Sequence, residues 1–226
     1  MGTWLHCPSP VTAEVMSKAG FDFLVVDNQH SVTGFAECID LIRTVTSHGV
    51  PAIVRISARN AAQVGRFLDA GATGIICPLI NTPEDAAEFA SSALYPPAGR
   101  RSFGPFRSRL IFDDTSPEAA NERAFLLAMI ETEEGLGNAD RIAAVPGISG
   151  LFAGPNDLAL SHGIAPKLDP TRPDVLNMLA KVATAGNKND SVAGIAIDSV
   201  DFMRVSRDLG FNWFVCASDV KFMERS

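Results

Sequence analysis

Eight short, apolar, β-branched segments alternate along this chain with longer segments whose apolar residues recur every three to four positions. The short segments have the length and composition of β-strands, and the longer ones have the periodicity of helices. Most successive short segments are separated by a dozen or more residues, which is enough for a helical crossover between parallel strands. The predicted strands are Thr3 to Cys7, Asp22 to Asp27, Ala52 to Ile56, Gly74 to Leu79, Phe125 to Ile130, Gly150 to Gly154, Ala193 to Ile197 and Trp213 to Ala217.

The helices predicted between these strands begin and end at recognisable residues. Asn60, Thr82 and Ser199 precede helices, where their side chains can cap the first turn. Glycines that can adopt the left-handed conformation of a helix end follow several of them, at Gly20, Gly49, Gly71 and Gly210. The predicted helices are Thr12 to Ala19, Phe35 to Ser47, Ala61 to Ala70, Pro83 to Ala93, Pro173 to Ala185 and Val200 to Leu209.

Several predicted strands read as nearly continuous apolar runs, such as LVV, IVRI and GIICPLI. Such runs are typical of a parallel sheet that is covered on both faces. An open, doubly wound sheet is the alternative, but it requires a glycine-containing phosphate-binding turn near the first strand, and Pro8 to Pro10 contains no glycine. The sequence therefore predicts an α/β fold, a (β/α)8 TIM barrel in which residues 1–226 form a single domain.

The overall charge argues against two classes of partner. Among the 226 residues, 19 Lys and Arg stand against 26 Asp and Glu, which gives a formal net charge of −7. A molecule of this charge repels nucleic acid and anionic membranes, and no apolar run approaches the roughly 20 residues that span a bilayer. We therefore expect a cytoplasmic protein that binds neither nucleic acid nor membrane. Its four cysteines form no CxxC pair, which indicates reduced thiols.

In a (β/α)8 barrel, the chemistry lies at the carboxyl ends of the strands. Polar residues stand at or just beyond four of these predicted ends: Asp27, Arg55, Glu131 and Asp157. His30 follows Asp27 by three residues. Three acids, an arginine and a histidine are therefore expected to surround one site.

Glu131 and Asp157 follow neighbouring predicted strands, which lie about 5 Å apart in a sheet. Two carboxylates that share a site repel each other unless a cation lies between them. Oxygen ligands of this kind favour Mg²⁺, Mn²⁺ or Co²⁺, with water and substrate completing the coordination shell. The alternative is a pair of surface acids at helix starts, since Asn156 and Asp157 could cap the short helix that follows.

His30 lies close enough to Asp27 for the carboxylate to orient the imidazole and make it a stronger base. This arrangement favours a catalytic base, although a lone loop histidine is more often a solvated surface group. Arg55 interrupts an apolar run, where a guanidinium needs an anionic partner. It suits a substrate carboxylate or enolate, or it pairs internally with Asp27 or Glu131. His6, at the end of the first strand, is a weaker candidate for the site.

The segment from Tyr95 to Arg123 interrupts the alternation. It is long, polar and rich in Pro, Gly and Arg, which is typical of a functional loop. Its arginines are either solvated or in contact with substrate or a neighbouring subunit, and their spacing alone favours solvation. They are Arg100, Arg101, Arg107 and Arg109.

Five segments, taken in order, carry a family signature. They are DFLVVDNQHS at 22–31, VR at 54–55, LYPPAGRRSFGP at 94–105, AMIETEEGL at 128–136 and GISGLFAGPNDLAL at 147–160. Together they resemble the HpcH/HpaI family of class II pyruvate aldolases, over nearly the whole chain. The resemblance implies a barrel that uses a divalent metal to cleave 4-hydroxy-2-oxo acids to pyruvate and an aldehyde. It also implies a homo-oligomer, a trimer or a hexamer.

The resemblance also assigns roles by position. Glu131 and Asp157 match the metal ligands. His30 matches a base that acts through a bound water, with Asp27 as its partner. Arg55 matches the residue that holds the carboxylate and the enolate of pyruvate.

The substrate pocket is implied in the same way. Backbone amides around Gly154, Pro155 and Asn156 would line the carboxylate site. Ala196 matches a position that shapes the aldehyde pocket, where a small side chain leaves room. The chain departs from the family at Met129, since many members carry Gln two residues before the metal-binding glutamate. The identity of the aldehyde is therefore open.

Other activities remain open at this point. A citrate-lyase-like member would act on an acyl-CoA thioester such as malyl-CoA or citryl-CoA, and Arg100 to Arg109 is the one candidate for binding the CoA phosphates. A non-catalytic barrel would bind a 2-oxo acid without turnover. A class I aldolase, which forms a Schiff base, is disfavoured because every lysine is predicted to lie in a helix or loop rather than at a strand end.

Overall fold

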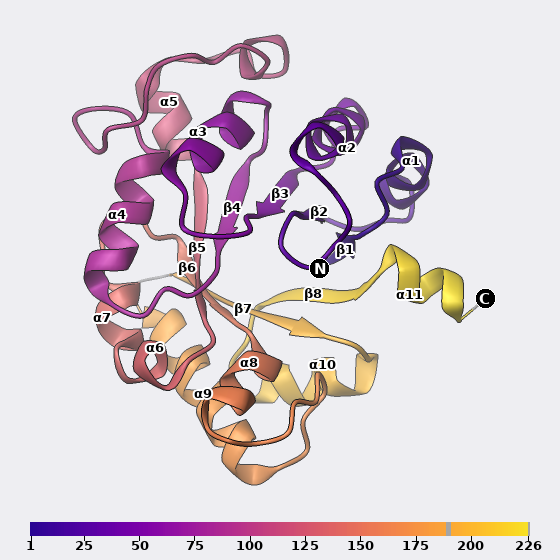
Figure 1. Ribbon diagram of the computed structural model, residues 1–226, viewed down its shortest axis with the longest axis vertical. Coiled ribbons are helices and arrows are strands. Elements are labelled where there is room, and N and C mark those ends of the chain that lie inside the picture. The colour runs from indigo at the N-terminus through magenta and orange to yellow at the C-terminus, as the bar shows by residue number, and fades with distance from the viewer. Residues whose placement is uncertain (189–190, 226) are drawn as a thin grey trace.

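All eight predicted strands form, and each pairs in parallel with the next one in the sequence (Figure 1). The computed structural model describes residues 1–188 and 191–225, and within these ranges β8 also pairs with β1, which closes the barrel. The predicted α/β fold, a (β/α)8 barrel, is confirmed. The strands are β1 (Gly2–Leu5), β2 (Phe23–Asp27), β3 (Ala52–Arg55), β4 (Gly74–Cys77), β5 (Phe125–Ile130), β6 (Gly150–Ala153), β7 (Val192–Ile197) and β8 (Trp213–Ser218).

Helices connect the strands and cover the barrel. The Oδ1 atom of Asn60 accepts hydrogen bonds from the N–H groups of Ala62 and Gln63, at 2.9 and 3.2 Å, so this predicted cap is confirmed. Thr82 and Asp85 cap their helix reciprocally. The helices are α1 (Pro10–Ser17), α2 (Phe35–Ser47), α3 (Ala61–Asp69), α4 (Pro83–Ala93), α5 (Pro117–Arg123), α6 (Glu133–Gly137), α7 (Ala139–Ala143), α8 (Pro155–Ser161), α9 (Pro173–Gly186), α10 (Val200–Asp208) and α11 (Asp219–Glu224), with a 3₁₀ turn, η1 (Ser108–Leu110).

Large aromatic side chains fill the inside of the barrel. The rings of Phe23 and Trp213 stack with centroids 4.1 Å apart, and the edge of Phe152 meets Trp213. Gly194 on β7 makes room for them, because a Cβ atom there would lie 2.8 Å from Phe152 and 3.0 Å from Trp213. A second and larger apolar layer lies between the strands and the surrounding helices. The filled interior therefore forms the floor on which a site at the strand ends is built.

The long polar segment that follows α4 lies at the amino ends of the strands, opposite the predicted site. Arg101 is 8% exposed, and its Nη2 atom lies 2.6 Å from the Asp69 carboxylate at the end of α3. The Nη1 atom of Arg107 donates to the carbonyl of Ala70, at 2.7 Å. The expectation that these arginines are solvated is therefore wrong for Arg101, whereas Arg100 and Arg109 are exposed.

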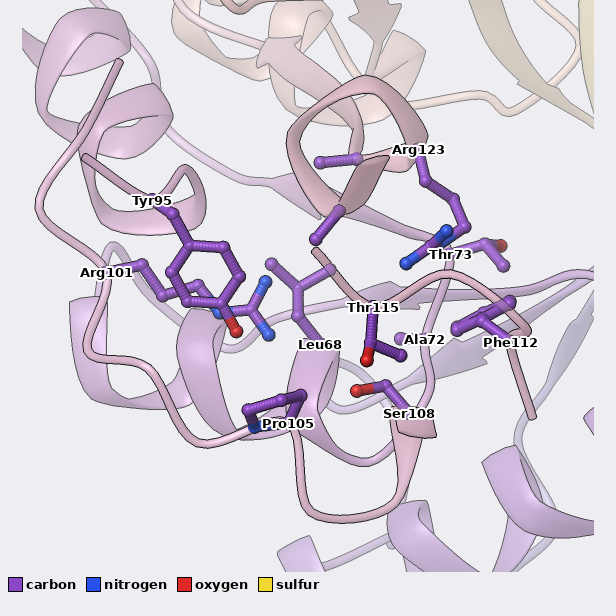
Figure 2. Close-up of a pocket in the computed structure, with 12 residues that line it drawn as sticks. Leu68, Ala72, Thr73, Tyr95, Arg101, Pro105, Ser108, Phe112, Thr115 and Arg123 are labelled. Atoms are coloured by element: carbon purple, nitrogen blue, oxygen red, sulfur yellow. The ribbon is translucent and has the colours of Figure 1, made fainter. Parts of the chain in front are cut away.

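Figure 2 shows how this segment packs against the barrel. The Tyr95 ring lies beside the Arg101 guanidinium, whose Cζ atom is 4.5 Å from the ring centroid. Pro105, Ser108 and Thr115 line the same cavity, which measures about 20 Å³, room for about one water molecule. The segment therefore closes the amino end of the barrel between α3 and β5.

Two other expectations concern the whole chain. Among the described residues, no helix combines the length and the apolar character that crossing a membrane requires. The four cysteines are free, as predicted, and burial raises the pKa of the Cys38 thiol to about 12. A thiol with so high a pKa is inert, which agrees with a structural role.

Candidate active site at the carboxyl ends of the strands

A cavity of about 210 Å³ opens at the carboxyl ends of the strands. Asp27 and Glu131 are almost completely buried beside it, at 0% and 3% exposure. The other predicted site residues line the cavity directly, and they are His30, Arg55, Gly154, Pro155, Asn156, Asp157 and Ala196. The barrel thus brings the predicted residues together around one space.

Arg55 and Asp27 form a buried ion pair. They stand side by side in the register of β2 and β3. The Nε and Nη2 atoms of Arg55 donate to the two carboxylate oxygens of Asp27, at 2.9 and 2.6 Å. The guanidinium also lies over the Trp4 ring, 4.2 Å from its centroid. Of the two internal partners that the sequence allowed, Asp27 and Glu131, the structure shows Asp27. The Nη1 atom of Arg55 has no acceptor among the described residues.

His6 is the histidine whose ring faces Asp27. Its Nε2 atom lies 3.1 Å from Oδ2 of Asp27, although the two groups are not aligned as a hydrogen bond. The contacts with His6 and Arg55 hold the pKa of Asp27 well below its usual value despite burial, which alone would raise it. Asp27 is therefore a permanent anion beneath the cavity.

The expected contact between Asp27 and the His30 imidazole is not present in the described structure. Asp27 instead accepts the backbone N–H groups of Gln29 and His30, at 3.0 and 3.3 Å. These bonds turn the chain after β2 and leave the His30 side chain exposed at the edge of the cavity. Asp27 therefore shapes the loop that carries His30 but does not orient its ring.

The sequence around His6 contains no signal that its ring would lie against Asp27. The Asp219 carboxylate at the start of α11 accepts the backbone N–H groups of His6 and Cys7, at 2.9 and 3.0 Å. This contact joins residues 213 positions apart. His6 was predicted only as a weaker candidate for the site, whereas Lys221 and Asp198, which also line the cavity, were not predicted there.

Glu131 is buried beneath the cavity wall. Its Oε1 atom accepts the backbone N–H of Leu79 at 2.7 Å, and no donor to Oε2 is found among the residues that the structure describes. Burial is the main cause that raises the pKa of Glu131 to about 7; the charge of Asp157 acts in the same direction, and the Leu79 N–H and Arg55 oppose the rise. A carboxyl with a pKa this high lies where a cation would be favourable.

Gly154 leaves the space beside Glu131 open. A Cβ atom at this position would lie 2.7 Å from the Met129 methyl carbon and 3.1 Å from Oε2 of Glu131. Asp157 lies in the first turn of α8, exposed at the cavity. The cap residue of α8 is Gly154, so the alternative reading of Asp157 as a helix cap is not supported.

These residues fit a hard divalent cation. Glu131 offers a free oxygen, Asp157 adds a second carboxylate, and the missing Cβ of Gly154 keeps the space beside Glu131 open. Within residues 1–188 and 191–225, no cluster of three or more His, Cys, Asp or Glu side chains forms a complete metal site. Two carboxylates with the remaining positions left to water and substrate are typical of Mg²⁺ sites.

Comparison with known proteins gives an independent result. The sequence model of a family described as HpcH/HpaI aldolase/citrate lyase matches residues 1–218. A hydroxypyruvate/pyruvate aldolase of Rhizorhabdus wittichii is 37% identical over 217 residues, which are 96% of this chain and 86% of that protein. A 2-dehydro-3,6-dideoxy-6-sulfogluconate aldolase of Pseudomonas putida is 31% identical over 99% of this chain and 88% of its own.

A solved structure extends the match to the fold. The crystal structure of a HpcH/HpaI aldolase/citrate lyase family protein from Burkholderia cenocepacia superimposes with a TM-score of 0.91 at 30% identity. The superposition covers 99% of this chain and 90% of that one. The barrel and its connections are therefore shared along almost the full length of both chains.

Proposed function

Because the chain belongs to the HpcH/HpaI aldolase/citrate lyase family, we propose that it is a metal-dependent pyruvate aldolase. It would reversibly cleave a 4-hydroxy-2-oxo acid to pyruvate and an aldehyde. The observation that carries this proposal is the arrangement of Asp157 and the Arg55 guanidinium in one cavity, with the Glu131 carboxyl buried beside it and within the electrostatic reach of both. The aldolase names of the similar proteins from R. wittichii and P. putida support the same reaction class.

Glu131 and Asp157 are the residues that would hold the metal, Mg²⁺, Mn²⁺ or Co²⁺. A divalent ion bound there would polarise the 2-oxo carbonyl group of the substrate as a Lewis acid. The raised pKa of Glu131 supports this role, since the carboxylate lacks a compensating charge in the protein alone. The half-buried Asn156, whose Oδ1 atom has no donor among the described residues, adds a polar group beside Gly154 and Pro155 at the carboxylate end of the substrate.

Arg55 supplies fixed positive charge where negative charge develops. C–C cleavage leaves the pyruvate half as an enolate, whose oxygen needs a nearby donor. Asp27 and the Trp4 ring hold the guanidinium in one orientation, so little reorganisation is required during the reaction. Its Nη1 atom is available to a carboxylate or enolate oxygen because the Asp27 contacts use Nε and Nη2.

His30 is proposed as the base that removes the proton from the 4-hydroxyl group through a water molecule. Its ring lines the cavity and has no carboxylate partner in the described chain, so it is free to approach substrate. His6 is held against Asp27 and is less suited to that movement. The expected homo-oligomer, trimer or hexamer, and the cytoplasmic location both remain predictions from the sequence.

The acyl-CoA alternative is weakened by the position of the arginine-rich segment. Arg101 and Arg107 contact the ends of α2 and α3 at the amino end of the barrel. The candidate site lies at the opposite end, so these charges are not available to CoA phosphates bound there. Comparing malyl-CoA with a 4-hydroxy-2-oxo acid as cleavage substrates would separate the two activities.

The first test is exchange of the pyruvate methyl protons in D₂O. We expect the protein with Mg²⁺, Mn²⁺ or Co²⁺ to exchange these protons, and excess EDTA to stop the exchange, because enolate formation needs only pyruvate and the metal site. Proton NMR of pyruvate measures the rate without knowledge of the natural aldehyde. Absence of exchange with every metal would favour a non-catalytic 2-oxo-acid-binding barrel, and exchange that persists in EDTA would contradict metal dependence.

The variant His30→Ala tests the proposed base. We expect retro-aldol turnover to fall by about 10²- to 10⁴-fold, which is the usual contribution of general base catalysis, while metal and pyruvate binding persist. Steady-state kinetics and a metal-binding titration give the two measurements. His162→Ala is a matched control, since that ring contacts the Leu158 carbonyl on α8 and not the cavity. Unchanged turnover in His30→Ala would remove His30 from the mechanism.

A further inference from the structure

The cavity has a second charged wall that the cleavage chemistry does not use. Lys221 on α11 and Asp198 after β7 both line it. The Nζ atom of Lys221 donates to Oδ2 of Asp198 at 2.6 Å. In the order of the barrel, β8 lies across the ring from β4, whereas Arg55 and Glu131 stand at the ends of the neighbouring β3 and β5. Lys221 therefore lies on the side of the barrel away from Glu131, which is the side left for the part of the substrate beyond the pyruvate half.

The Lys221 ammonium group is the more exposed member of this ion pair. The Lys221 side chain is 40% exposed, against 21% for Asp198. The other carboxylate oxygen of Asp198, Oδ1, is enclosed and has no donor in the described chain. Lys221 donates only to Asp198 among the described residues, so two of its three N–H groups remain for a ligand.

A second cation balances Asp198. The Nη2 atom of Arg225 lies 3.2 Å from the same Oδ2 atom, although Arg225 does not line the cavity. Asp169 contacts Asp198 through the backbone, accepting its N–H at 2.8 Å, and also stays outside the cavity lining. Because Arg225 offsets the Asp198 carboxylate, the charge of Lys221 is available to a ligand.

The position of Lys221 is fixed by the start of its helix. Ser218 accepts the backbone N–H of Lys221 at 3.2 Å. Asp219, which is 1% exposed, fastens the same turn to the end of β1 through the N–H groups of His6 and Cys7. These hydrogen bonds therefore hold in place the backbone from which the ammonium group reaches the cavity.

We propose that Lys221 is a specificity-determining residue that binds a terminal oxyanion on the aldehyde half of the substrate. The preferred aldehydes would carry a carboxylate, sulfonate or phosphate at the end away from the carbonyl group. A compact ammonium pairs with any of these groups as a point charge through charge-assisted hydrogen bonds. This inference rests on the proposed aldolase function and names its substrate class.

The test compares two aldehydes of equal chain length in the aldol direction, 4-oxobutanoate and butanal, each with pyruvate. We expect the protein to prefer 4-oxobutanoate in kcat/KM. In Lys221→Met, kcat/KM for 4-oxobutanoate falls by about 10- to 100-fold, the usual effect of losing a hydrogen bond to a charged group, and the value for butanal stays within about twofold. Lys221→Arg retains part of the preference, since it keeps the positive charge.

Two controls separate the possible failures. Lys181→Met removes an exposed lysine on α9, away from the cavity, and leaves both kcat/KM values unchanged. Pyruvate proton exchange persists in Lys221→Met, because the variant retains the fold and the pyruvate half of the site. Absence of pyruvate proton exchange in the unaltered protein would overturn the aldolase function itself.

Three outcomes with exchange intact would overturn the role of Lys221. The first is an equal change for both aldehydes, and the second is no change for either. The third is a preference for neutral glyceraldehyde over glyceraldehyde 3-phosphate and 4-oxobutanoate that Lys221→Met removes, which would show recognition of a hydroxyl group. Comparing 3-sulfopropanal, glyceraldehyde 3-phosphate and 4-oxobutanoate identifies which oxyanion binds best.

Discussion

Replacing Glu131 with Gln is expected to abolish pyruvate proton exchange and C–C cleavage, with a loss of at least about 10³-fold. A Lewis acid contributes several kcal/mol to such a reaction, and each 1.4 kcal/mol corresponds to about a factor of ten. The amide that replaces the carboxylate has nearly the same shape but no charge to hold the metal. Titration with Mn²⁺, followed by proton NMR of pyruvate, measures binding and exchange in the same samples.

The control for this variant is Glu134→Gln, on the exposed first turn of α6. We expect it to bind Mn²⁺ and to exchange pyruvate protons as the unaltered protein does. Asp157→Asn provides a second test of the metal site, with weaker metal binding expected because one carboxylate remains. Normal Mn²⁺ affinity in Glu131→Gln would place the metal elsewhere.

The same variant has a pH signature in the absence of metal. The pKa of Glu131 rises from 4.5 to about 7 on folding. Between these values the unfolded chain releases the proton while the folded protein keeps it, so stability falls as the pH rises. The fall amounts to about 3 kcal/mol and is complete above pH about 7. In Glu131→Gln this contribution disappears, and urea unfolding at pH 5 and pH 8 measures the difference.

The second large effect is expected for Arg55→Met. This variant leaves the Asp27 carboxylate, which is 0% exposed, without the bidentate hydrogen bonds from Arg55. Removing one member of a buried ion pair typically costs about 3–5 kcal/mol, because the other charge stays buried and unpaired. Chemical denaturation gives this free energy. We also expect the KM for pyruvate to rise, since the guanidinium lines the cavity.

The double variant Arg55→Met with Asp27→Asn separates the two effects. It removes the buried charge, so most of the lost stability is expected to return, whereas pyruvate binding stays weak because Arg55 is still absent. Arg141→Met is a control, since Arg141 is exposed on α7 and its loss is expected to change stability by no more than about 0.5 kcal/mol. A single Arg55→Met variant as stable as the unaltered protein would contradict the ion-pair argument.

The barrel was predictable because its signals are local. The limits of α2 and α4 agree with the prediction at both ends, since apolar spacing and the capping residue at Thr82 define them within a few positions. The prediction missed α5, α6, α7 and α11, which have five to seven residues each and are too short to show a helical period. Residue order along the strands was enough to place the site at the carboxyl ends.

The partners inside the site depend on long-range geometry. Sequence distance favoured the pairing of Asp27 with His30, three residues away. The barrel instead places β1 beside β2, and this neighbour brings the His6 ring to the Asp27 carboxylate. Lys221 was predicted only to lie in a helix or loop and not at a strand end, and it lies in α11, a helix that the prediction missed. Its contact with the cavity depends on closure of the barrel, which no short segment encodes.

The seam between β8 and β1 affects the order in which the site can form during synthesis. A ribosome makes the chain from the amino end, so Arg55, Glu131 and Asp157 emerge before β8 and α11. Asp219 can accept the backbone N–H of His6 only after α11 has been made. The wall that carries Lys221 is added at the same moment. The residues proposed to bind pyruvate are therefore synthesised before the residue proposed to select the aldehyde.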